Sequence, residues 1–132
     1  MRHPVTITAL YAAGLAMMLI WLSFNVIRLR RQQRISLLDG GNAALTQAMR
    51  AHGNFTEYVP LALILMAILE LDQAPGALVH GIGLTLLAGR VSHAYGLIDG
   101  RSLRPRVAGM MLTFASLGLA ATGAVLTVIG VL

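Results

Sequence analysis

Four long apolar stretches, separated by short polar segments, constrain the fold of this 132-residue chain more than any other feature. They cover residues 5–27, 43–71, 75–98 and 107–132. A helix needs about 20 largely apolar residues to cross a bilayer, and each stretch reaches that length. Hydrophobic residues make up 57% of the chain and charged residues 11%, which is too apolar for a soluble domain. The sequence therefore predicts an all-α integral membrane protein, in which residues 1–132 form one domain, a four-transmembrane-helix bundle.

The distribution of arginine predicts how this bundle crosses the membrane. Arg28, Arg30, Arg31 and Arg34 follow the first stretch, and Arg101, Arg104 and Arg106 lie between the third and the fourth. The segment between the second and third stretches has no basic residue. Loops rich in arginine stay on the cytoplasmic side, so we expect the first and third loops to be cytoplasmic. A topology signal and attraction to anionic membrane lipid account for the net charge of +5, and we expect no nucleic-acid partner.

Polar residues interrupt the second stretch in a helical pattern. Arg50, Asn54 and Glu57 are spaced at i, i+4 and i+7, which places them on one side of a helix. A charge near the centre of a bilayer costs about 2.5–3.5 kcal/mol. This side of the helix must therefore face another helix, water or a charged ligand.

The third stretch carries a second polar pair at a similar depth. Arg90 and His93 lie one turn apart, near the end that is predicted to be cytoplasmic. Counting either Arg104 or Arg106, three cations face the single carboxylate of Glu57, and this excess of positive charge suits an anionic ligand. A structural alternative stays open, in which an ion pair between Glu57 and Arg90 locks two helices together and His93 only packs.

Two sequence motifs give the chain a resemblance to a known family. RAHGNFTEYVP at residues 50–60, preceded by DGGN at 39–42, and GRVSHAYG at residues 89–96 resemble the MAPEG family, the membrane-associated proteins in eicosanoid and glutathione metabolism. The resemblance covers the whole four-helix chain and is to the bacterial type of member. It implies a homotrimer in a bacterial inner membrane, with glutathione held between neighbouring subunits toward the cytoplasmic side. The residues that it places in or beside the glutathione site are Arg50, Asn54, Glu57, Tyr58, Arg90 and His93.

The chemistry of glutathione is compatible with these side chains. Its two carboxylates suit the guanidinium forks of Arg50 and Arg90. Glu57 can accept from its ammonium group. The remaining side chains would add neutral hydrogen bonds that fix its orientation, namely those of Asn54, Tyr58 and His93.

The expected function is a glutathione-dependent transferase or peroxidase that acts on small lipophilic electrophiles at the membrane. Arg104 or Arg106 would stabilise the glutathione thiolate. We favour Arg106 because it heads the fourth stretch, where the amino terminus of a helix adds partial positive charge. The chain has no cysteine, and we expect no metal site.

Leu97 keeps a second function open. Eicosanoid-handling relatives carry a tyrosine at this position, and Tyr95 is predicted to point to a different side of the helix. The alternative is a non-catalytic membrane protein that binds lipid or glutathione, or acts as a scaffold. A small multidrug-type transporter fits less well, because residues 5–27 hold no acidic residue. Glu70 is expected to lie at a solvated helix end.

Overall fold

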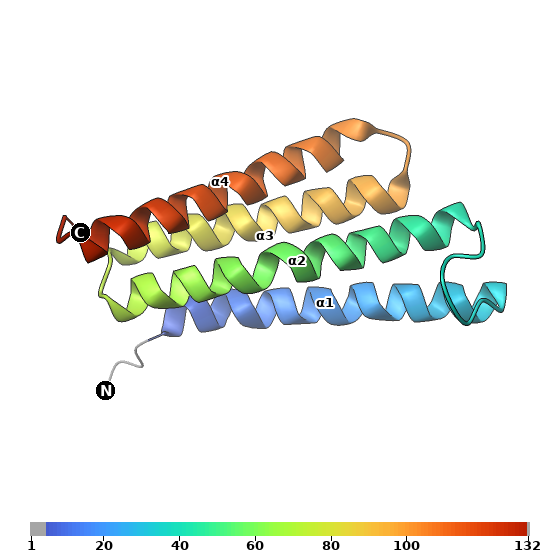
Figure 1. The fold of residues 1–132 in the computed structure, drawn as a ribbon, viewed down its shortest axis with the longest axis horizontal. Coiled ribbons are helices and arrows are strands. Elements are labelled where there is room, and N and C mark those ends of the chain that lie inside the picture. The colour runs from blue at the N-terminus through green and yellow to red at the C-terminus, as the bar shows by residue number, and fades with distance from the viewer. Residues whose placement is uncertain (1–4, 132) are drawn as a thin grey trace.

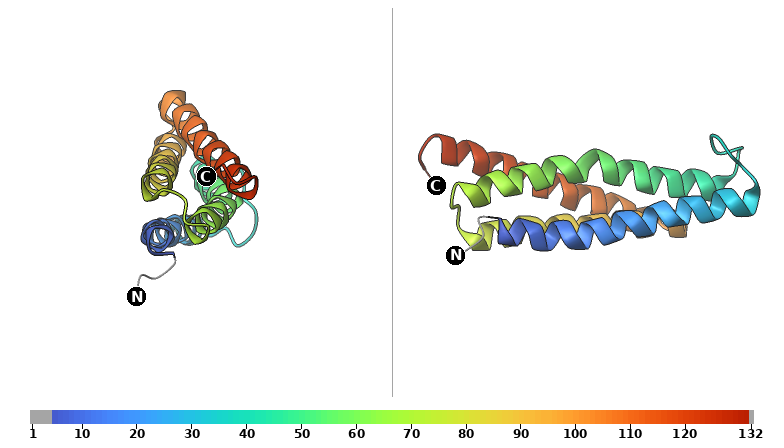
Figure 2. Two further views of the ribbon diagram at one scale, coloured as in Figure 1. Left: turned by 90° about the vertical axis from the view of Figure 1, so that its left-hand side faces the viewer. Right: turned by 90° about the horizontal axis from the view of Figure 1, so that it is seen from below.

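A computed structural model describes residues 5–131, which form four helices. These are α1 (Thr6–Gln33), α2 (Ala43–Leu71), α3 (Gly76–Asp99) and α4 (Leu103–Val128). They run alternately up and down as one bundle, in which α1 packs on α2 and α3, and α4 packs on α3 and α2 (Figures 1 and 2). The all-helical bundle confirms the predicted fold class.

Three of the described helices, α1, α2 and α4, are long and apolar enough to cross a membrane. The remaining helix, α3, is not among these candidate spans, and its sequence includes His80, Arg90 and His93. It nevertheless lies lengthwise against α2 and α4 inside the bundle (Figure 1). Its polar side chains are therefore accommodated by neighbouring helices, as the sequence required.

The loops that carry arginine gather at one end of the bundle. The α1–α2 and α3–α4 connections lie at that end, whereas the α2–α3 turn and both ends of the described chain lie at the other (Figure 1). This arrangement is the one that the arginine distribution requires. We call the first of these ends the loop end; its cytoplasmic orientation stays a prediction.

The loop end departs from the predicted helix boundaries. Helix α1 continues beyond residue 27 to Gln33, so Arg28, Arg30 and Arg31 are helical rather than part of a loop. Its cap residue Arg34 adopts a left-handed conformation with φ of 55°. Charged residues limit the part of a helix that can lie in the bilayer, but arginine is compatible with helical structure. Helix α1 therefore continues past its apolar part to Gln33.

Helix α4 also begins earlier than predicted, at Leu103 instead of residue 107. The Ser102 hydroxyl accepts from the backbone N–H of Arg104 at 3.3 Å and caps the helix. Pro105 falls in the first turn, where proline is tolerated. Arg104 and Arg106 therefore lie on the first turns of α4 rather than in the third loop, and residue 132 lies outside the described residues.

Glycine lets the backbones of α3 and α4 approach closely near this end. A Cβ atom on Gly96 would lie 2.5 Å from the backbone nitrogen of Arg106, and one on Gly109 would overlap the backbone of His93. Small residues at such crossings allow close packing of membrane helices. The crossing fixes where α4 begins relative to the polar residues of α3.

Glu70 has a role at the opposite end of the bundle that the sequence did not reveal. Its two carboxylate oxygens accept from the backbone N–H groups of Ile7 and Thr8, each at 2.7 Å. These are among the unpaired donors at the start of α1. Glu70 is therefore a capping residue that ties α2 to α1; it is partly exposed at the end of α2, and the sequence-based expectation of a solvated helix end did not include this capping role.

Candidate functional site

Arg90 is the most buried charged side chain of the described residues, with 1% of its surface exposed. Its Nε and Nη2 atoms donate to the Thr113 hydroxyl at 3.0 and 2.6 Å, and Nη1 donates to the backbone carbonyl of Asn54 at 3.3 Å. The guanidinium carbon lies 5.7 Å from the centre of the Tyr58 ring. Arg90 thus joins α2, α3 and α4 through neutral groups.

The ion pair between Glu57 and Arg90, considered from the sequence, does not form within the protomer. Among residues 5–131 the one ion pair is that of Arg101 with Asp99, at 3.9 Å. Glu57 is exposed, whereas the guanidinium of Arg90 points into the bundle. The helix-locking interpretation therefore does not explain Glu57.

His93 is buried and fixes the start of α4. Its Nδ1 atom lies 3.0 Å from the backbone carbonyl of Arg106. A carbonyl only accepts, so Nδ1 carries the proton in this contact. The Ser92 hydroxyl donates to the neighbouring carbonyl of Pro105 at 2.8 Å. Two consecutive side chains of α3 thus hold the backbone that carries Arg106, while His93 Nε2 is buried without a hydrogen-bond partner.

A pocket of about 490 Å³ opens at the loop end between α2, α3 and α4. Arg50 of α2 and Arg106 of α4 both line it, as does Leu97 of α3. We call it the cationic pocket, because its lining contains two guanidinium groups and no carboxylate. Arg104 is exposed on the first turn of α4 and is not part of this lining.

A second pocket of about 490 Å³ adjoins the cationic pocket along α2. Both are lined by Thr46 and Arg50, and the second continues to Asn54 and Glu57. Asp39 also lines it, and we call it the acidic pocket. Asn54 is held in place by a hydrogen bond from its side-chain nitrogen to the carbonyl of Arg50 at 3.0 Å.

Asp39 is an ionised member of the acidic pocket that the sequence did not single out. The Thr46 hydroxyl donates to its Oδ2 atom at 2.7 Å, and the Gly41 N–H donates to Oδ1 at 3.1 Å. These hydrogen bonds, that of Thr46 first, hold the pKa of Asp39 below its ordinary value. Charge is therefore divided between two pockets that share Arg50: Arg106 lines one of them, and Asp39 and Glu57 line the other.

The structure divides the sequence-predicted residues into two groups. Arg50, Asn54, Glu57 and Arg106 line the two adjoining pockets, whereas Arg90 and His93 are buried behind them. Tyr58 is half-buried and packs edge-on against Phe114, with ring centres 5.7 Å apart.

Sequence reasoning missed three residues of this region, namely Asp39, Thr46 and Thr113. Thr46 precedes Arg50 by one turn, so extending the polar stripe of α2 backwards would have found it. Thr113 lies on α4, and the spacing of residues along α3 holds no information about it.

Comparison with known proteins shows the family of the chain. The family model described as "MAPEG family" matches residues 8–126. The chain belongs to the MAPEG family. It is 44% identical over 111 residues to "Inner membrane protein YecN" of Escherichia coli strain K12, and the match covers 84% of each chain. YecN of Escherichia coli O6:H1 matches to the same extent.

Family membership makes this chain a membrane protein, in agreement with its apolar helices. The MAPEG family includes glutathione-dependent transferases, whereas the name of YecN states a location and no activity. The specific chemistry of the chain therefore has to be argued from its own pockets.

Proposed function

We propose that this MAPEG-family protein is a glutathione-dependent transferase or peroxidase acting on hydrophobic electrophiles at a bacterial inner membrane. The observation that carries the proposal is the separation of charge in the two adjoining pockets along α2. Glutathione carries an ammonium group and a carboxylate together at its γ-glutamyl end, and a second carboxylate at its glycine end. A pocket in which Arg50 lies with Asp39 and Glu57 can pair with both charges of the γ-glutamyl end, and the adjoining pocket adds a further guanidinium for an anionic group.

The exposed residues provide the contacts in this proposal. Arg50 lies where the two pockets adjoin and binds a glutathione carboxylate, for which its fork of N–H donors is suited. Glu57, together with Asp39, accepts from the ammonium group. Asn54 and Tyr58 orient the peptide between them.

The buried residues hold these contacts in position. Arg90 donates to the carbonyl of Asn54, and His93 binds the carbonyl of Arg106. Through these two contacts, Arg90 positions the backbone of α2 at Asn54 and His93 positions the backbone of α4 at Arg106. A direct contact of His93 with glutathione would use Nε2, which has no hydrogen-bond partner, while Nδ1 stays bound to the carbonyl of Arg106.

Arg106 is the residue that we assign to the thiolate. A free thiol has a pKa of about 8.5, so only a few per cent is ionised at neutral pH. Lowering this pKa by two units requires about 2.7 kcal/mol of preferential stabilisation of the anion. A guanidinium in a pocket without carboxylates supports such a role, and Arg106 is in that pocket with Arg50.

The proposed chemistry balances without a resident cofactor. In transfer, the thiolate sulfur forms a bond to the electrophilic carbon, the leaving group departs with its electron pair, and the thiol proton passes to solvent. In peroxide reduction, two glutathione molecules lose two electrons and form a disulfide, while the hydroperoxide becomes an alcohol and water.

A pair of variants tests the proposal. Glutathione bound to the wild type should show the ultraviolet absorbance of a thiolate at neutral pH. Arg106→Ala should still bind glutathione but lose this absorbance and the conjugation of a generic electrophile. Arg104→Ala is the matched control and should retain both, because Arg104 lies outside the lining of the cationic pocket.

Two outcomes would overturn the assignment. If the wild type bound glutathione only as the neutral thiol, the enzymatic function would be wrong and a binding function would replace it. If Arg104→Ala, rather than Arg106→Ala, lost the thiolate signal, Arg104 would hold the role proposed for Arg106.

A further inference from the structure

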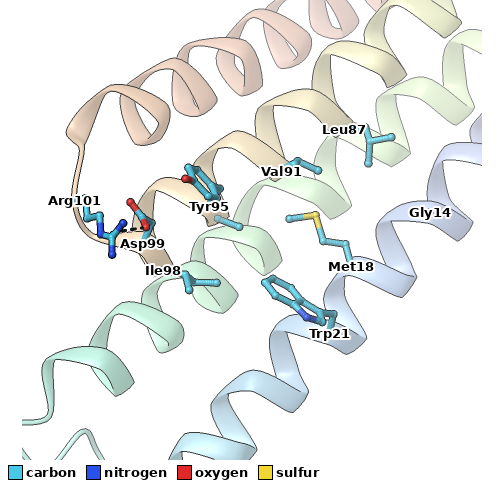
Figure 3. A pocket seen from close by; sticks show the side chains of 10 residues that line it. Gly14, Met18, Trp21, Leu87, Val91, Tyr95, Ile98, Asp99 and Arg101 are labelled. Atoms are coloured by element: carbon cyan, nitrogen blue, oxygen red, sulfur yellow. Dashed lines mark ion pairs between the residues drawn. The ribbon is translucent and has the colours of Figure 1, made fainter.

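A groove of about 800 Å³ lies between α1 and α3, on a different side of α3 from Arg90 and His93. Apolar and aromatic side chains line most of its length. They come from Met18 and Trp21 of α1 and from Val91, Tyr95 and Ile98 of α3 (Figure 3).

The groove has the length of one lipid chain. Helices α1 and α3 run in the same direction, so the groove follows the long axis of the bundle (Figure 1). From Leu87 to Asp99 it spans about 18 Å of α3 at 1.5 Å per residue. One leaflet contributes about 15 Å, half of a hydrocarbon core roughly 30 Å thick. Gly14 lines the groove beside open space, since a Cβ atom there would meet nothing within 4 Å.

Two opposite charges lie where the groove reaches the loop end. Asp99 ends α3, and Arg101 follows it at 3.9 Å (Figure 3). The Arg101 side chain is 88% exposed, so this ion pair is loose and both groups can bind a further partner. Tyr95 is exposed near them and Trp21 is exposed across the groove on α1, and such aromatic residues are enriched where a membrane meets water (Figure 3).

We propose that this groove binds one membrane phospholipid whose headgroup carries a primary ammonium beside its phosphate, as in phosphatidylethanolamine. An acyl chain lies between α1 and α3. Arg101 binds the phosphate, for which a guanidinium is well suited, and Asp99 accepts from the ammonium N–H donors. Charge complementarity selects this headgroup: a glycerol headgroup offers Asp99 hydroxyl donors but no positive charge, and a choline headgroup has the charge but no N–H donor.

The position of Trp21 provides a direct test, because the chain has one tryptophan. Phospholipids with brominated acyl chains quench tryptophan on contact. The full chain, in detergent micelles, is titrated with brominated ethanolamine, choline and glycerol phospholipids. We expect saturable quenching by the ethanolamine lipid, with half-quenching at a concentration at least fivefold lower than for the other two.

Matched variants connect this quenching to the groove. Gly14→Leu fills the groove and should weaken saturable quenching at least tenfold. Gly118→Leu is the control, since Gly118 is exposed on α4 and a Cβ atom there also meets nothing within 4 Å. It should leave quenching unchanged. Asp99→Asn should remove the preference for ethanolamine and retain binding of the acyl chain.

Three results would overturn the proposal. Quenching that rises without saturation and equally for all headgroups would mean that the lipid acts only as solvent. If the Gly14→Leu variant formed a smaller oligomer but showed unchanged quenching, a second copy of the chain, and not a lipid, would cover the groove. If Gly14→Leu fails to fold, native mass spectrometry of the wild type measures which lipids stay bound. Equal retention of ethanolamine and choline lipids would contradict the proposal.

Discussion

At the scale of single residues, Asp39 shows how a loop can hold a charge ready for a ligand. Its carboxylate accepts from the Thr46 hydroxyl and the Gly41 N–H, and these bonds lower its pKa. Because the pKa is lower in the folded protein, ionised Asp39 stabilises the α1–α2 loop above its ordinary pKa. That stabilisation is lost as pH falls through the lowered value.

Thr46→Val should therefore raise the pKa of Asp39 toward its ordinary value of 3.8. Valine has nearly the shape of threonine but cannot donate the hydrogen bond. A carboxyl NMR titration of the protein in micelles measures the change. Thr127→Val, near the end of α4, is the control and should leave the titration of Asp39 as it is. An unchanged pKa in Thr46→Val would show that the Gly41 N–H alone controls this carboxyl.

Glu57→Gln should weaken glutathione binding about tenfold. The substitution keeps the shape of the side chain and removes the charge that pairs with the ammonium group. A charged hydrogen bond contributes about 1.5–3 kcal/mol, and the exposure of Glu57 places it at the lower limit. Isothermal titration calorimetry measures the loss, with Glu70→Gln at the other end of the bundle as the control. Intact affinity together with reduced oligomer stability would make Glu57 a structural residue.

The sequence predicts the residues of one helix face better than their partners. Spacing along α2 correctly groups Arg50, Asn54 and Glu57, which line the acidic pocket. The resemblance to the MAPEG family and the chemistry of glutathione led us to expect Arg90 to bind a ligand carboxylate, but within the protomer its donors face Thr113 and the backbone of Asn54. Which side chain meets Arg90 depends on the relative positions of α3 and α4, which no periodicity within one helix encodes.

At the scale of the helices, the close crossing of α3 and α4 determines where Arg106 lies. The backbones meet at Gly89, Gly96 and Gly109, where a Cβ atom would crowd the neighbouring helix. Hydrogen bonds from Ser92 and His93 to the first turns of α4 fix the same crossing. The position of the proposed thiolate-binding guanidinium is thus a property of this helix pair.

Gly109→Ala should destabilise the protein, because the added methyl group overlaps the backbone of His93. Overpacking of this kind costs about 1–3 kcal/mol. Gly118→Ala on the same helix is the control, since nothing lies within 4 Å of its Cβ position. Alanine is the better helix former there by about 0.5–1 kcal/mol. Thermal unfolding in detergent should therefore rank Gly109→Ala below the wild type and Gly118→Ala at or above it, and equal stability of the two variants would show that the crossing relaxes.

Helix boundaries were predictable to within one residue for α2 and α3, and not at the end of α1 or at either end of α4. Both ends of α2 agree with the sequence, where Asn42 caps the helix by accepting from the N–H of Leu45 at 2.9 Å. Helices α1 and α4 extend into the arginine-rich segments, because a helix outside the bilayer loses nothing by carrying charge. The Ser102 cap and Pro105 in the first turn were visible signals for the start of α4, and the neighbouring arginines obscured them.

At the scale of the whole molecule, the polar stripe of α2 is not covered by the other helices of the protomer. Arg50 and Glu57 are both exposed, although Glu57 lies about 21 Å along α2 from its start. Helix α2 is about 44 Å long and exceeds the roughly 30 Å hydrocarbon core by some 14 Å. If all of this excess of about 14 Å projects from the membrane at the loop end, Glu57, which is about 21 Å from the start of α2, still lies about 7 Å inside the hydrocarbon core. A lone protomer would present this carboxylate to lipid.

We therefore expect neighbouring copies to cover the stripe and complete the glutathione site, and the resemblance to the MAPEG family implies that the assembly is a trimer. Leaving a charge against lipid costs about 2.5–3.5 kcal/mol near the bilayer centre, and closed symmetric assembly covers the same surface on every copy. Native mass spectrometry in mild detergent should give three times the 14.0 kDa chain mass. The Glu57→Leu variant is the comparison. It removes the charge that is unfavourable against lipid, so a larger fraction of the protein should be monomeric, and glutathione binding should be lost. A stable wild-type monomer that still binds glutathione would contradict the shared site, because the pockets along α2 would then be complete within one chain.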